Sequence, residues 1–425
     1  MREPRAGNAV DLLVDDELWR PLLRAIRDAR EEILLTQLFF TPSFAPLGIP
    51  LADELEEAGK RGARVRVLVN QNAAVPDSWD ELRERFEGTR VEVARILMTP
   101  NVMHAKILVA DGREAFVLDA PFEAKYLDGS LHAFSSAGPR RRPFHSVSTR
   151  VRGPAVADLH AFVARLFVAA GEEAPPPRPA PAVAGAIPIR LAWTAPPGFF
   201  EANAELGILR AYEEAILGAR SLVYAETQYL TSPRMHDLFA RAAERAEVVL
   251  VVNEHMDIPG YDAWQSRGLA RIGAGAHPRL GAFSLWAASR TATARQIYVH
   301  SKVGIVDDRW LTIGSANLDS LSLHESTEFP VRVPPNVELN LVIEDASFAA
   351  HARRRLWAEH LRDEGIWTAR APRDGWLSHW RAVAERNARA LQAARPQVGR
   401  VFRFEALSSR MRPHHGSGTR RTPGA

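Results

Sequence analysis

Short runs of consecutive apolar residues alternate along the chain with segments rich in alanine and charged residues. Two of these runs, 64–70 (RVRVLVN) and 247–253 (EVVLVVN), are rich in valine and end in asparagine. Continuous apolar runs of this length are typical of central strands that helices cover on both faces of a sheet. The alternation of such strands with helical segments therefore predicts the α/β fold class.

The order of these elements occurs twice. In each half, a helix rich in alanine and charge is followed by an apolar strand, a second helix, a second strand and a motif-bearing strand. Segment 25–37 corresponds to segment 215–229, with helical residues at an offset of 190 and Thr-Gln pairs at an offset of 191. Repetition at a nearly constant offset predicts two copies of one domain.

A proline-rich segment separates the two copies. Residues 172–186 read EEAPPPRPAPAVAGA, which is too rich in proline for a helix or a central strand and predicts a semi-rigid linker. We therefore expect an N-terminal domain at 1–171 and a C-terminal domain at 187–395. The last two helices of the second domain are expected at about 346–362 and 376–394.

Charge is distributed unevenly between the body of the chain and its end. The 425 residues include 54 lysines and arginines against 51 acidic residues, for a net charge of +3. Residues 396–425 hold six arginines and one glutamate, so this tail carries +5 and the rest of the chain about −2. A nearly neutral body argues against a general polyanion binder, and no stable nucleic-acid complex is expected. The basic tail is expected to be solvated and disordered.

Composition also bears on the compartment. Cysteine is absent, which excludes a disulfide framework and thiolate metal sites. The first residues are expected to lead into a polar helix, without the apolar core and cleavage site of a signal peptide. No segment approaches 18 uninterrupted apolar residues, the length of a membrane span. These features predict a soluble cytoplasmic protein and leave its oligomeric state open.

One short pattern, H-x-K-x-x-x-x-D, occurs in both halves at positions 196 residues apart. Histidine and lysine alternate with apolar residues in both copies, so a strand there would place both functional side chains on one face. Imidazole and ammonium would then point together into one pocket. The residues of the two motifs are His104, Lys106 and Asp111 in the first half and His300, Lys302 and Asp307 in the second.

The residue types in this pattern suit chemistry at phosphorus. Histidine titrates near neutrality, so two histidines can share the roles of nucleophile and general acid. Lysine supplies a fixed positive charge and three donors for phosphate oxygens. One histidine and one lysine from each half would permit in-line displacement through a covalent phosphohistidine. No H-E-x-x-H pattern, carboxylate cluster at ligand spacing or phosphate-binding glycine loop occurs, so we expect no metal and no cofactor.

The double motif, with Gly314-Ser315-Ala316-Asn317 seven residues after Asp307, resembles the phospholipase D superfamily. The resemblance extends to about residue 390. It implies two α/β/α sandwich domains packed side by side, with one shared active site at their interface. The implied activity is that of a metal-independent phosphodiesterase or phosphatidyltransferase, which cleaves or exchanges a phospholipid headgroup through a phosphohistidine. Without a membrane-spanning segment, such an enzyme is expected to reach its lipid through peripheral membrane contact.

The resemblance implies roles for individual residues. His104 is the expected nucleophile, and His300 is the expected general acid. Lys106 and Lys302 are expected to bind the phosphate. The other implied site residues are the polar catalytic Asn317 and four supporting residues, namely Asp111, Asp307, Ser315 and Glu328, the last as the carboxylate that orients a histidine. Gln37, Gln228 and Tyr229 end corresponding strands, where α/β sheets place ligands, and are expected substrate contacts.

The first motif departs from the family pattern in its flank. Asp119 and Ala120 stand where the family often has glycine and serine, so a carboxylate and a β-carbon are added where the backbone often approaches phosphate closely, and Asp119 is a further expected substrate contact. Two interpretations follow, a changed substrate geometry or a decayed half-site. The alternatives to a lipid enzyme are therefore a nuclease or nucleotide phosphodiesterase with the same site, and a non-catalytic pseudoenzyme that binds lipid or a partner. His132 and His145 are expected to be surface or satisfied polar histidines.

Overall fold

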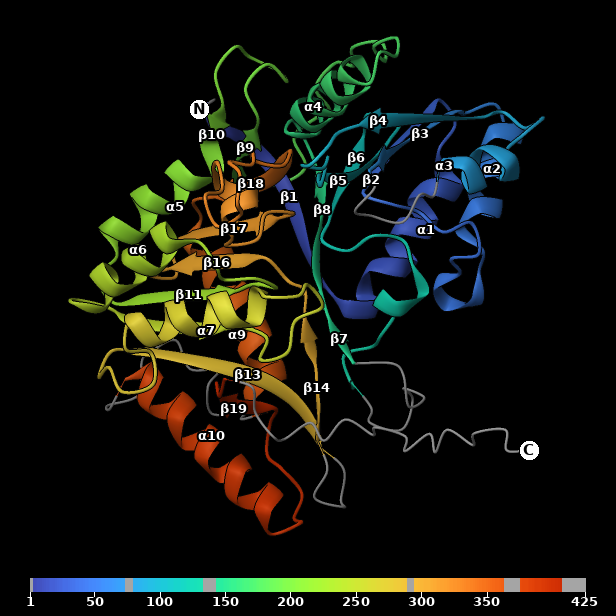
Figure 1. Cartoon of the computed structure of the whole chain (residues 1–425). Coiled ribbons are helices and arrows are strands. Elements are labelled where there is room, and N and C mark those ends of the chain that lie inside the picture. Colours follow the sequence, from blue (N-terminus) through green and yellow to red (C-terminus); the bar gives the residue numbers. More distant parts are fainter. Residues whose placement is uncertain (1–2, 73–78, 133–142, 289–293, 363–374, 407–425) are drawn as a thin grey trace, which may run out of the picture.

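The computed structural model describes residues 3–72, 79–132, 143–288, 294–362 and 375–406. Strands from both halves lie side by side in one large sheet, and helices cover its two faces (Figure 1). The mixed α/β class and the internal repeat predicted from the sequence are both confirmed. The repeat is visible in the order of the strands.

The first half begins with the strand that lies nearest to the second half. Hydrogen-bonded neighbours in this half follow the order β4 (Val91–Leu97), β3 (Arg64–Gln71), β2 (Glu32–Gln37), β5 (Lys106–Ala110), β6 (Glu114–Leu118), β8 (Val147–Arg152) and β1 (Arg5–Val14). Its helices are α1 (Trp19–Asp28), α2 (Leu51–Lys60), α3 (Trp79–Arg85) and α4 (Val156–Ala169).

The second half repeats this order. Its strands are β13 (Leu280–Ala288), β12 (Glu247–Val251), β11 (Leu222–Glu226), β16 (Val303–Val306), β17 (Trp310–Gly314), β18 (Glu338–Ile343) and β9 (Ile187–Ala195), with β10 (Glu205–Leu206) beside β9 and both β14 (Ala294–Gln296) and β19 (Val401–Arg403) beside β13. Its helices are α5 (Gly207–Gly218), α6 (Pro233–Ala243), α7 (Tyr261–Arg271), α8 (Ser320–Leu323), α9 (Ala346–Leu361) and α10 (Trp376–Gln392).

Strand β1 connects the two halves of the sheet. It pairs antiparallel with β8 of its own half and with β9 of the second half. The expectation of a polar helix at the start of the chain is therefore wrong. The physical reason is the alternation of residues along β1, since Val10 and Leu12 pack on the core while Asp11 between them pairs with arginines at the surface. A short parallel pair, β7 (Phe144–His145) and β15 (Tyr298–Val299), joins the halves a second time.

Alternate residues of the central strands enter different cores. In β2, Ile33 and Leu35 pack with α1 and α2, whereas Leu34 belongs to a core with α4, α9 and α10. The latter core contains strand residues from both halves, and α5, α6 and α7 cover the outer face of the second half. Helices on both faces explain why these strands read as continuous apolar runs.

The segments outside the repeats only partly match the predictions. Residues 172–186 form neither helix nor strand and lie between α4 and β9. The tail was expected to be disordered from residue 396, but Val401–Arg403 form β19 and Arg400 is buried. Apolar Val401 and Phe402 explain this difference, because they pack into the core beside β13. Residues 407–425 of the tail lie outside the described residues.

Within the described ranges, no helix combines the length and the apolar character needed to cross a bilayer.

Candidate active site

The two motifs are anchored in the same way in each half. Asn70 at the end of β3 accepts a hydrogen bond from the Met103 amide at 2.8 Å. Asn253, just after β12, accepts one from the Val299 amide at 2.9 Å. These are the asparagines that end the two valine-rich runs. Each therefore fixes the residue that precedes a motif histidine, which explains why the runs end in the same polar residue.

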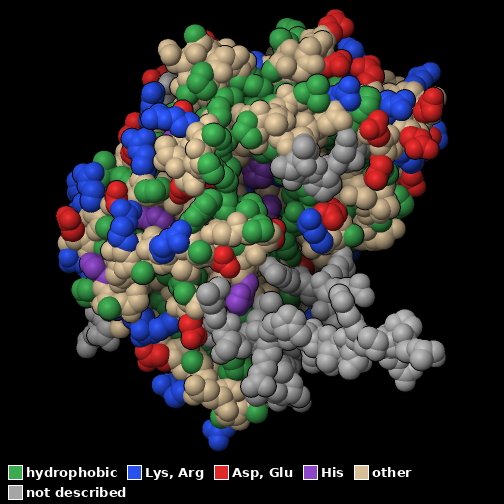
Figure 2. Space-filling model, in the orientation of Figure 1, with side chains coloured by type: hydrophobic (Ala, Val, Ile, Leu, Met, Phe, Trp, Pro, Cys, Tyr) green, Lys and Arg blue, Asp and Glu red, His purple; other side chains and the backbone are tan. Residues whose placement is uncertain are grey.

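Each motif histidine is also held by the opposite half of the chain. The His104 amide donates to the Val337 carbonyl of the second half at 2.8 Å, and the His300 amide donates to the His145 carbonyl of the first half at 2.8 Å. His104 and His300 interact electrostatically across the boundary. Figure 2 shows histidine side chains near the middle of one face, where hydrophobic side chains gather between the halves. The motifs therefore form one shared site.

A buried carboxylate orients His104. The Nδ1 atom of His104 lies 2.9 Å from Glu338, whose oxygens also accept hydrogen bonds from Ser315 (2.5 Å) and Ser322 (2.8 Å). Burial opposes ionisation of Glu338, but His104, Lys106 and Ser315 hold its pKa below the ordinary value. The Nδ1–H of His104 is thereby fixed, and its Nε2 keeps a free lone pair.

The sequence prediction chose a different glutamate for this role. Glu328 is half-buried, and its carboxylate accepts a hydrogen bond from Ser326 at 3.2 Å. It lies ten residues before Glu338, which opens β18 between β17 and β9. The orienting carboxylate in the structure is thus Glu338. No motif in the sequence marks Glu338, because its approach to His104 depends on how strands of different halves pack.

His300 has different neighbours. Its Nδ1 accepts a hydrogen bond from Lys302 Nζ at 2.9 Å and lies 3.6 Å from Asp119 Oδ2. The rings of Tyr126 and Phe144 lie against the imidazole, with centroids 5.3 and 5.1 Å away. Burial, reinforced by Lys302, holds the pKa of His300 well below its ordinary value. A neutral His300 therefore carries its proton on Nε2, the opposite tautomer to His104.

Both motif lysines are buried beside the histidines. Lys106 Nζ donates to the His104 carbonyl at 2.8 Å, and Lys302 Nζ also lies 3.4 Å from Gln228 Oε1. Burial and repulsion from Lys302 lower the pKa of Lys106 to about 7. Burial lowers the pKa of Lys302 to about 8, although Asp119 and Glu338 oppose the change. Because the site disfavours the protonated forms of both lysines, it favours the binding of an anion, whose negative charge would restore the positive charges of the lysines.

Asp119 occupies in the first repeat the position that Ser315 occupies in the second. In the strand pairing, Asp119 lies opposite β8 in the same way that Ser315 lies opposite β18. By the same alignment, Ser146 of the first half corresponds to Glu338 of the second half. Val147 donates its amide to Asp119 Oδ2 at 3.2 Å, just as Leu339 donates to Ser315 Oγ at 3.1 Å. The pair Ser315 and Glu338 of the second half thus corresponds to the pair Asp119 and Ser146 of the first half, where Asp119 is the residue that lies near His300. In the first half the carboxylate therefore lies beside the neighbouring strand of the sheet, compared with its place in the second half. This favours the interpretation of a changed substrate geometry over that of a decayed half-site.

Replacement of Asp119 by asparagine is expected to lower kcat about 10- to 100-fold with a small change in KM, because it removes the negative charge beside His300. Steady-state kinetics on lipid vesicles measure this. The double substitution Asp119→Ser with Ser146→Glu rebuilds at His300 the arrangement found at His104, and it should recover activity relative to Asp119→Ser alone. A fully active Asp119→Asn protein would show that this carboxylate does not support His300.

The motif aspartates lie away from the reacting groups. Asp111 accepts hydrogen bonds from the amides of residues 30–32 at 2.8–3.2 Å, and Asp307 accepts the amides of residues 220–222 at 2.8 Å. Both adopt left-handed backbone conformations, with φ of 51° and 52°. Each aspartate therefore fastens the far end of its motif strand to the loop before the first apolar strand of its half, consistent with the expected supporting role.

The remaining predicted site residues are buried near the motifs. Gln228 donates to the Tyr229 hydroxyl at 2.8 Å, and Tyr229 donates to Asp257 at 2.5 Å. Among the described residues, the side-chain amide of Gln37 and the Oδ1 of Asn317 have no hydrogen-bond partner. Buried polar atoms without partners are costly, so both side chains are available to a substrate. Sequence reasoning missed Glu338 and Asp257, which no motif marks.

Two histidines of opposite tautomer, two lysines and an interface between repeats define a phospholipase D-like enzyme. The family model described as cardiolipin synthase, PLD-like domain, matches residues 22–120 and 212–359, more than half of the chain. The chain therefore belongs to this family within the phospholipase D superfamily, as the motifs indicated.

Curated relatives and a solved structure agree with this assignment. Cardiolipin synthase B from Escherichia coli O6:H1 is 27% identical over 383 residues, covering 83% of this chain and 80% of the relative. Cardiolipin synthase B from Salmonella typhimurium is 27% identical over 387 residues, with the same coverage. The crystal structure of phosphatidylserine synthase from Haemophilus influenzae Rd KW20 superposes with a TM-score of 0.61 and 13% identity over 84% of this chain and 87% of that one, and shows the same fold.

Proposed function

We propose that the chain is a phosphatidyltransferase that moves a phosphatidyl group from one phospholipid headgroup alcohol to another, with cardiolipin as a product. The opposite tautomers of the two histidines carry this proposal. His104, with Nδ1–H held by Glu338, offers a nucleophilic Nε2, whereas His300 offers an Nε2–H donor. The names of the curated relatives support the choice of cardiolipin.

In the first step, His104 Nε2 forms a bond to phosphorus while the bond from phosphorus to the headgroup oxygen breaks. His300 donates its Nε2 proton to the leaving oxygen and receives a replacement at Nδ1 from Lys302, whose lowered pKa suits this transfer. In the second step, the acceptor alcohol forms a bond to phosphorus while the bond from phosphorus to His104 Nε2 breaks. The proton of the alcohol passes to His300 Nε2, and the Nδ1 proton of His300 returns to Lys302. Charge at the phosphoryl oxygens is stabilised by Lys106, and no step requires a metal.

The asymmetry of the site gives each half one task. The first half supplies the nucleophile and the second half supplies the proton donor, so donor and acceptor alcohols enter on the side of His300. The substrate lies in a bilayer, and we propose that the protein reaches it by peripheral contact with the membrane surface. The cytoplasmic location expected from the sequence stays a prediction.

Incubation with vesicles that contain phosphatidylglycerol is expected to yield cardiolipin and free glycerol, detected by mass spectrometry of lipid extracts. Phosphatidic acid in place of cardiolipin would assign hydrolysis instead of transfer. Cleavage of single-stranded DNA without lipid turnover would favour the nuclease alternative. Absence of any turnover and of phosphohistidine after a substrate pulse would identify a pseudoenzyme. A chelator added at the start of the assay should leave the initial rate unchanged.

A further inference from the structure

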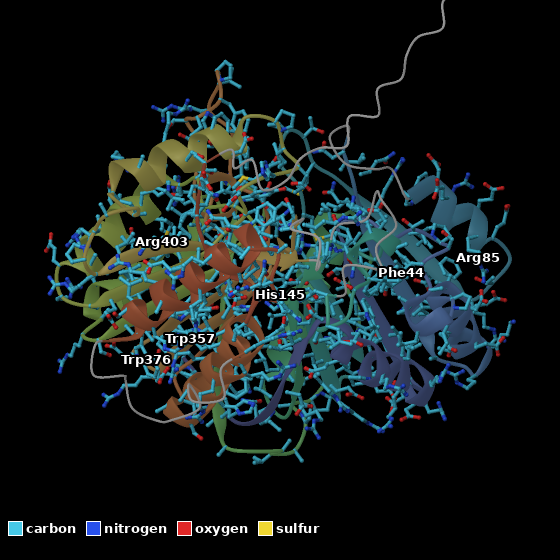
Figure 3. The ribbon with its side chains drawn as sticks, turned by 90° about the horizontal axis from the view of Figure 1, so that it is seen from below. Phe44, Arg85, His145, Trp357, Trp376 and Arg403 are labelled. Atoms are coloured by element: carbon cyan, nitrogen blue, oxygen red, sulfur yellow. The ribbon has the colours of Figure 1, made fainter. Side chains whose placement is uncertain are left out.

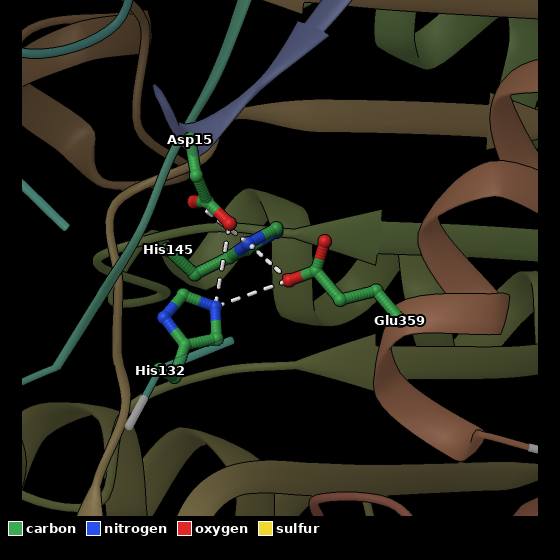
Figure 4. A group of neighbouring side chains, drawn as sticks. All are labelled: Asp15, His132, His145 and Glu359. Carbon is green, nitrogen blue, oxygen red and sulfur yellow. Dashed lines mark hydrogen bonds and ion pairs between the residues drawn. The ribbon is translucent and has the colours of Figure 1, made fainter. Parts of the chain in front are cut away.

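A second group of titratable side chains lies behind His300 and takes no part in the proposed reaction. We call Asp15, His132, His145 and Glu359 the buried cluster. Their side chains come from the short 3-10 helix η1 (Asp15–Leu18) that follows β1, the loop before β7, β7 itself and α9. Figure 4 shows the four side chains pointing toward one another, and Figure 3 places His145 at the boundary between the halves. All four side chains are buried, at 4% exposure or less.

The spacing of the cluster atoms matches that of metal ligands. Glu359 Oε1 lies 3.1 Å from both His132 Nε2 and His145 Nδ1. Asp15 Oδ2 lies 3.4 Å from His132 Nε2, and Asp15 Oδ1 lies 3.4 Å from His145 Nδ1. In a tetrahedral zinc site with bonds of about 2.0–2.1 Å, neighbouring ligand atoms are roughly 3.3 Å apart. The four separations given, which involve both oxygens of Asp15, are close to this value, and one ligand atom from each residue can be chosen so that all four lie within 4.8 Å of one another.

Two atoms of the cluster lack hydrogen bonds. Among the described residues, no group makes a hydrogen bond with Nδ1 of His145 or with Oδ2 of Asp15. The Nδ1 atom lies 3.1 Å from Glu359, but the pair does not have hydrogen-bond geometry. Leaving polar atoms buried without partners costs about 1–3 kcal/mol each. A cation at the centre of the cluster would satisfy both atoms at once.

The outer nitrogen of each imidazole is already bound by another carboxylate. His132 Nδ1 lies 2.9 Å from Asp128 Oδ2, and His145 Nε2 lies 3.1 Å from Glu226 Oε2. When these outer nitrogens carry the protons, His132 Nε2 and His145 Nδ1 present lone pairs to the centre of the cluster. A histidine that binds a metal through one ring nitrogen usually donates the N–H of its other nitrogen to a carboxylate.

The charges of the surroundings also favour a cation. Two carboxylates, those of Asp15 and Glu359, face the same pair of imidazoles in a buried space. Arg400 lies 3.3 Å and Arg355 lies 3.5 Å from Glu359, whereas the ion pairs of Asp15 among the described residues are those with the two histidines. When both imidazoles are neutral, these pairs leave the Asp15 carboxylate without a full positive charge beside it. A divalent ion supplies that charge.

We propose that the buried cluster binds one divalent transition-metal ion, with zinc as the preferred occupant, through His132, His145, Asp15 and Glu359. Imidazole nitrogen in the ligand set disfavours magnesium and calcium, which prefer oxygen ligands alone. Protein side chains fill all four positions, as in structural zinc sites. The ion links β1, β7 and α9, and because the His145 carbonyl holds the His300 amide, it supports the catalytic histidine without touching the phosphorus.

Metal analysis of the full-length protein tests this proposal without reference to activity. Protein purified without an affinity histidine tag and without chelator is expected to contain about one zinc per chain by mass spectrometry. Protein prepared with cobalt should show the visible absorption bands of tetrahedral cobalt. His132→Gln and Asp15→Asn should each lose the metal and the cobalt bands. His160→Gln is the matched control, since His160 is a buried histidine that pairs with Glu32 at 2.9 Å outside the cluster.

Three results would overturn the proposal. One is a folded protein that contains no metal, shows no cobalt bands and does not melt at a higher temperature with added zinc. Another is the retention of metal by the cluster variants, which would place the ion elsewhere. The third is a metal-free protein whose stability falls as pH rises above neutrality, because histidines whose pKa is raised in the folded state lose their stabilising charge in that direction. That result would assign protons to the cluster. If a cluster variant does not fold, the metal content and cobalt spectrum of the unmodified protein still decide.

Discussion

Replacement of His104 by alanine is expected to reduce phosphatidyl transfer by at least about 10⁴-fold, whatever the leaving group, because the covalent intermediate cannot form. Replacement of His300 by alanine should reduce transfer from a lipid headgroup by about 10²- to 10⁴-fold. With a p-nitrophenyl phosphodiester, whose leaving group needs no proton, the His300→Ala protein should release a burst of nitrophenol and accumulate phosphohistidine. Stopped-flow absorbance and intact-protein mass spectrometry measure both effects.

The comparison of the two variants assigns the nucleophile. A burst in the His104→Ala protein and none in the His300→Ala protein would reverse the assigned roles. Full activity of either variant with lipid would end the two-histidine mechanism. Circular dichroism should first establish that both variants are folded, since both histidines are buried at the boundary between the halves.

Replacement of Glu338 by glutamine is expected to lower kcat by on the order of 10³-fold with little change in KM. A glutamine side chain can donate to Nδ1 of His104, which favours the tautomer with the proton on Nε2 and blocks the attacking lone pair. Loss of the negative charge also removes stabilisation of the histidine in the transition state. Initial rates of cardiolipin formation across a range of lipid concentrations measure the effect.

Glu328 provides the matched control for this substitution. Glu328→Gln makes the same chemical change ten residues away, at a half-buried carboxylate that contacts Ser326. Its expected effect on kcat is less than about threefold, as for most changes outside a site. Equal damage by both substitutions would show that the loss at Glu338 comes from general destabilisation. Greater damage at Glu328 would restore the assignment made from the sequence.

The sequence predicted the repeat, the fold class and the four motif residues because each depends on local pattern. Apolar runs identify strands covered on both faces, and the H-x-K spacing places two side chains on one face of a strand. The relation of His104 to Glu338 could not be predicted in this way, since it depends on which strands of different halves lie together. The choice of Glu328 failed for this reason, as spacing within one segment does not determine contacts across the interface.

Two other groupings could not be predicted from the sequence for the same physical reason. His132 and His145 were expected to be surface or satisfied polar histidines, because neither has a partner at a recognised spacing, and both are buried beside carboxylates. The structure brings them together with Asp15 and Glu359, which are more than 200 residues apart. Similarly, Asp119 was interpreted as the replacement of a glycine when the first motif was considered alone. Its relation to Ser146 emerges only when strand pairing aligns the two repeats.

The continuity of the sheet through β1 and β9 has an evolutionary consequence. Two identical subunits would be obliged to give both histidines the same surroundings, because any substitution would appear on both sides of the symmetry axis. A single chain with two covalently joined repeats is free of that obligation. The exchange of carboxylate and serine between Glu338–Ser315 and Asp119–Ser146 is a change that only such a chain can accumulate. Duplication within one gene therefore allows the half that supplies the nucleophile and the half that supplies the proton donor to diverge independently.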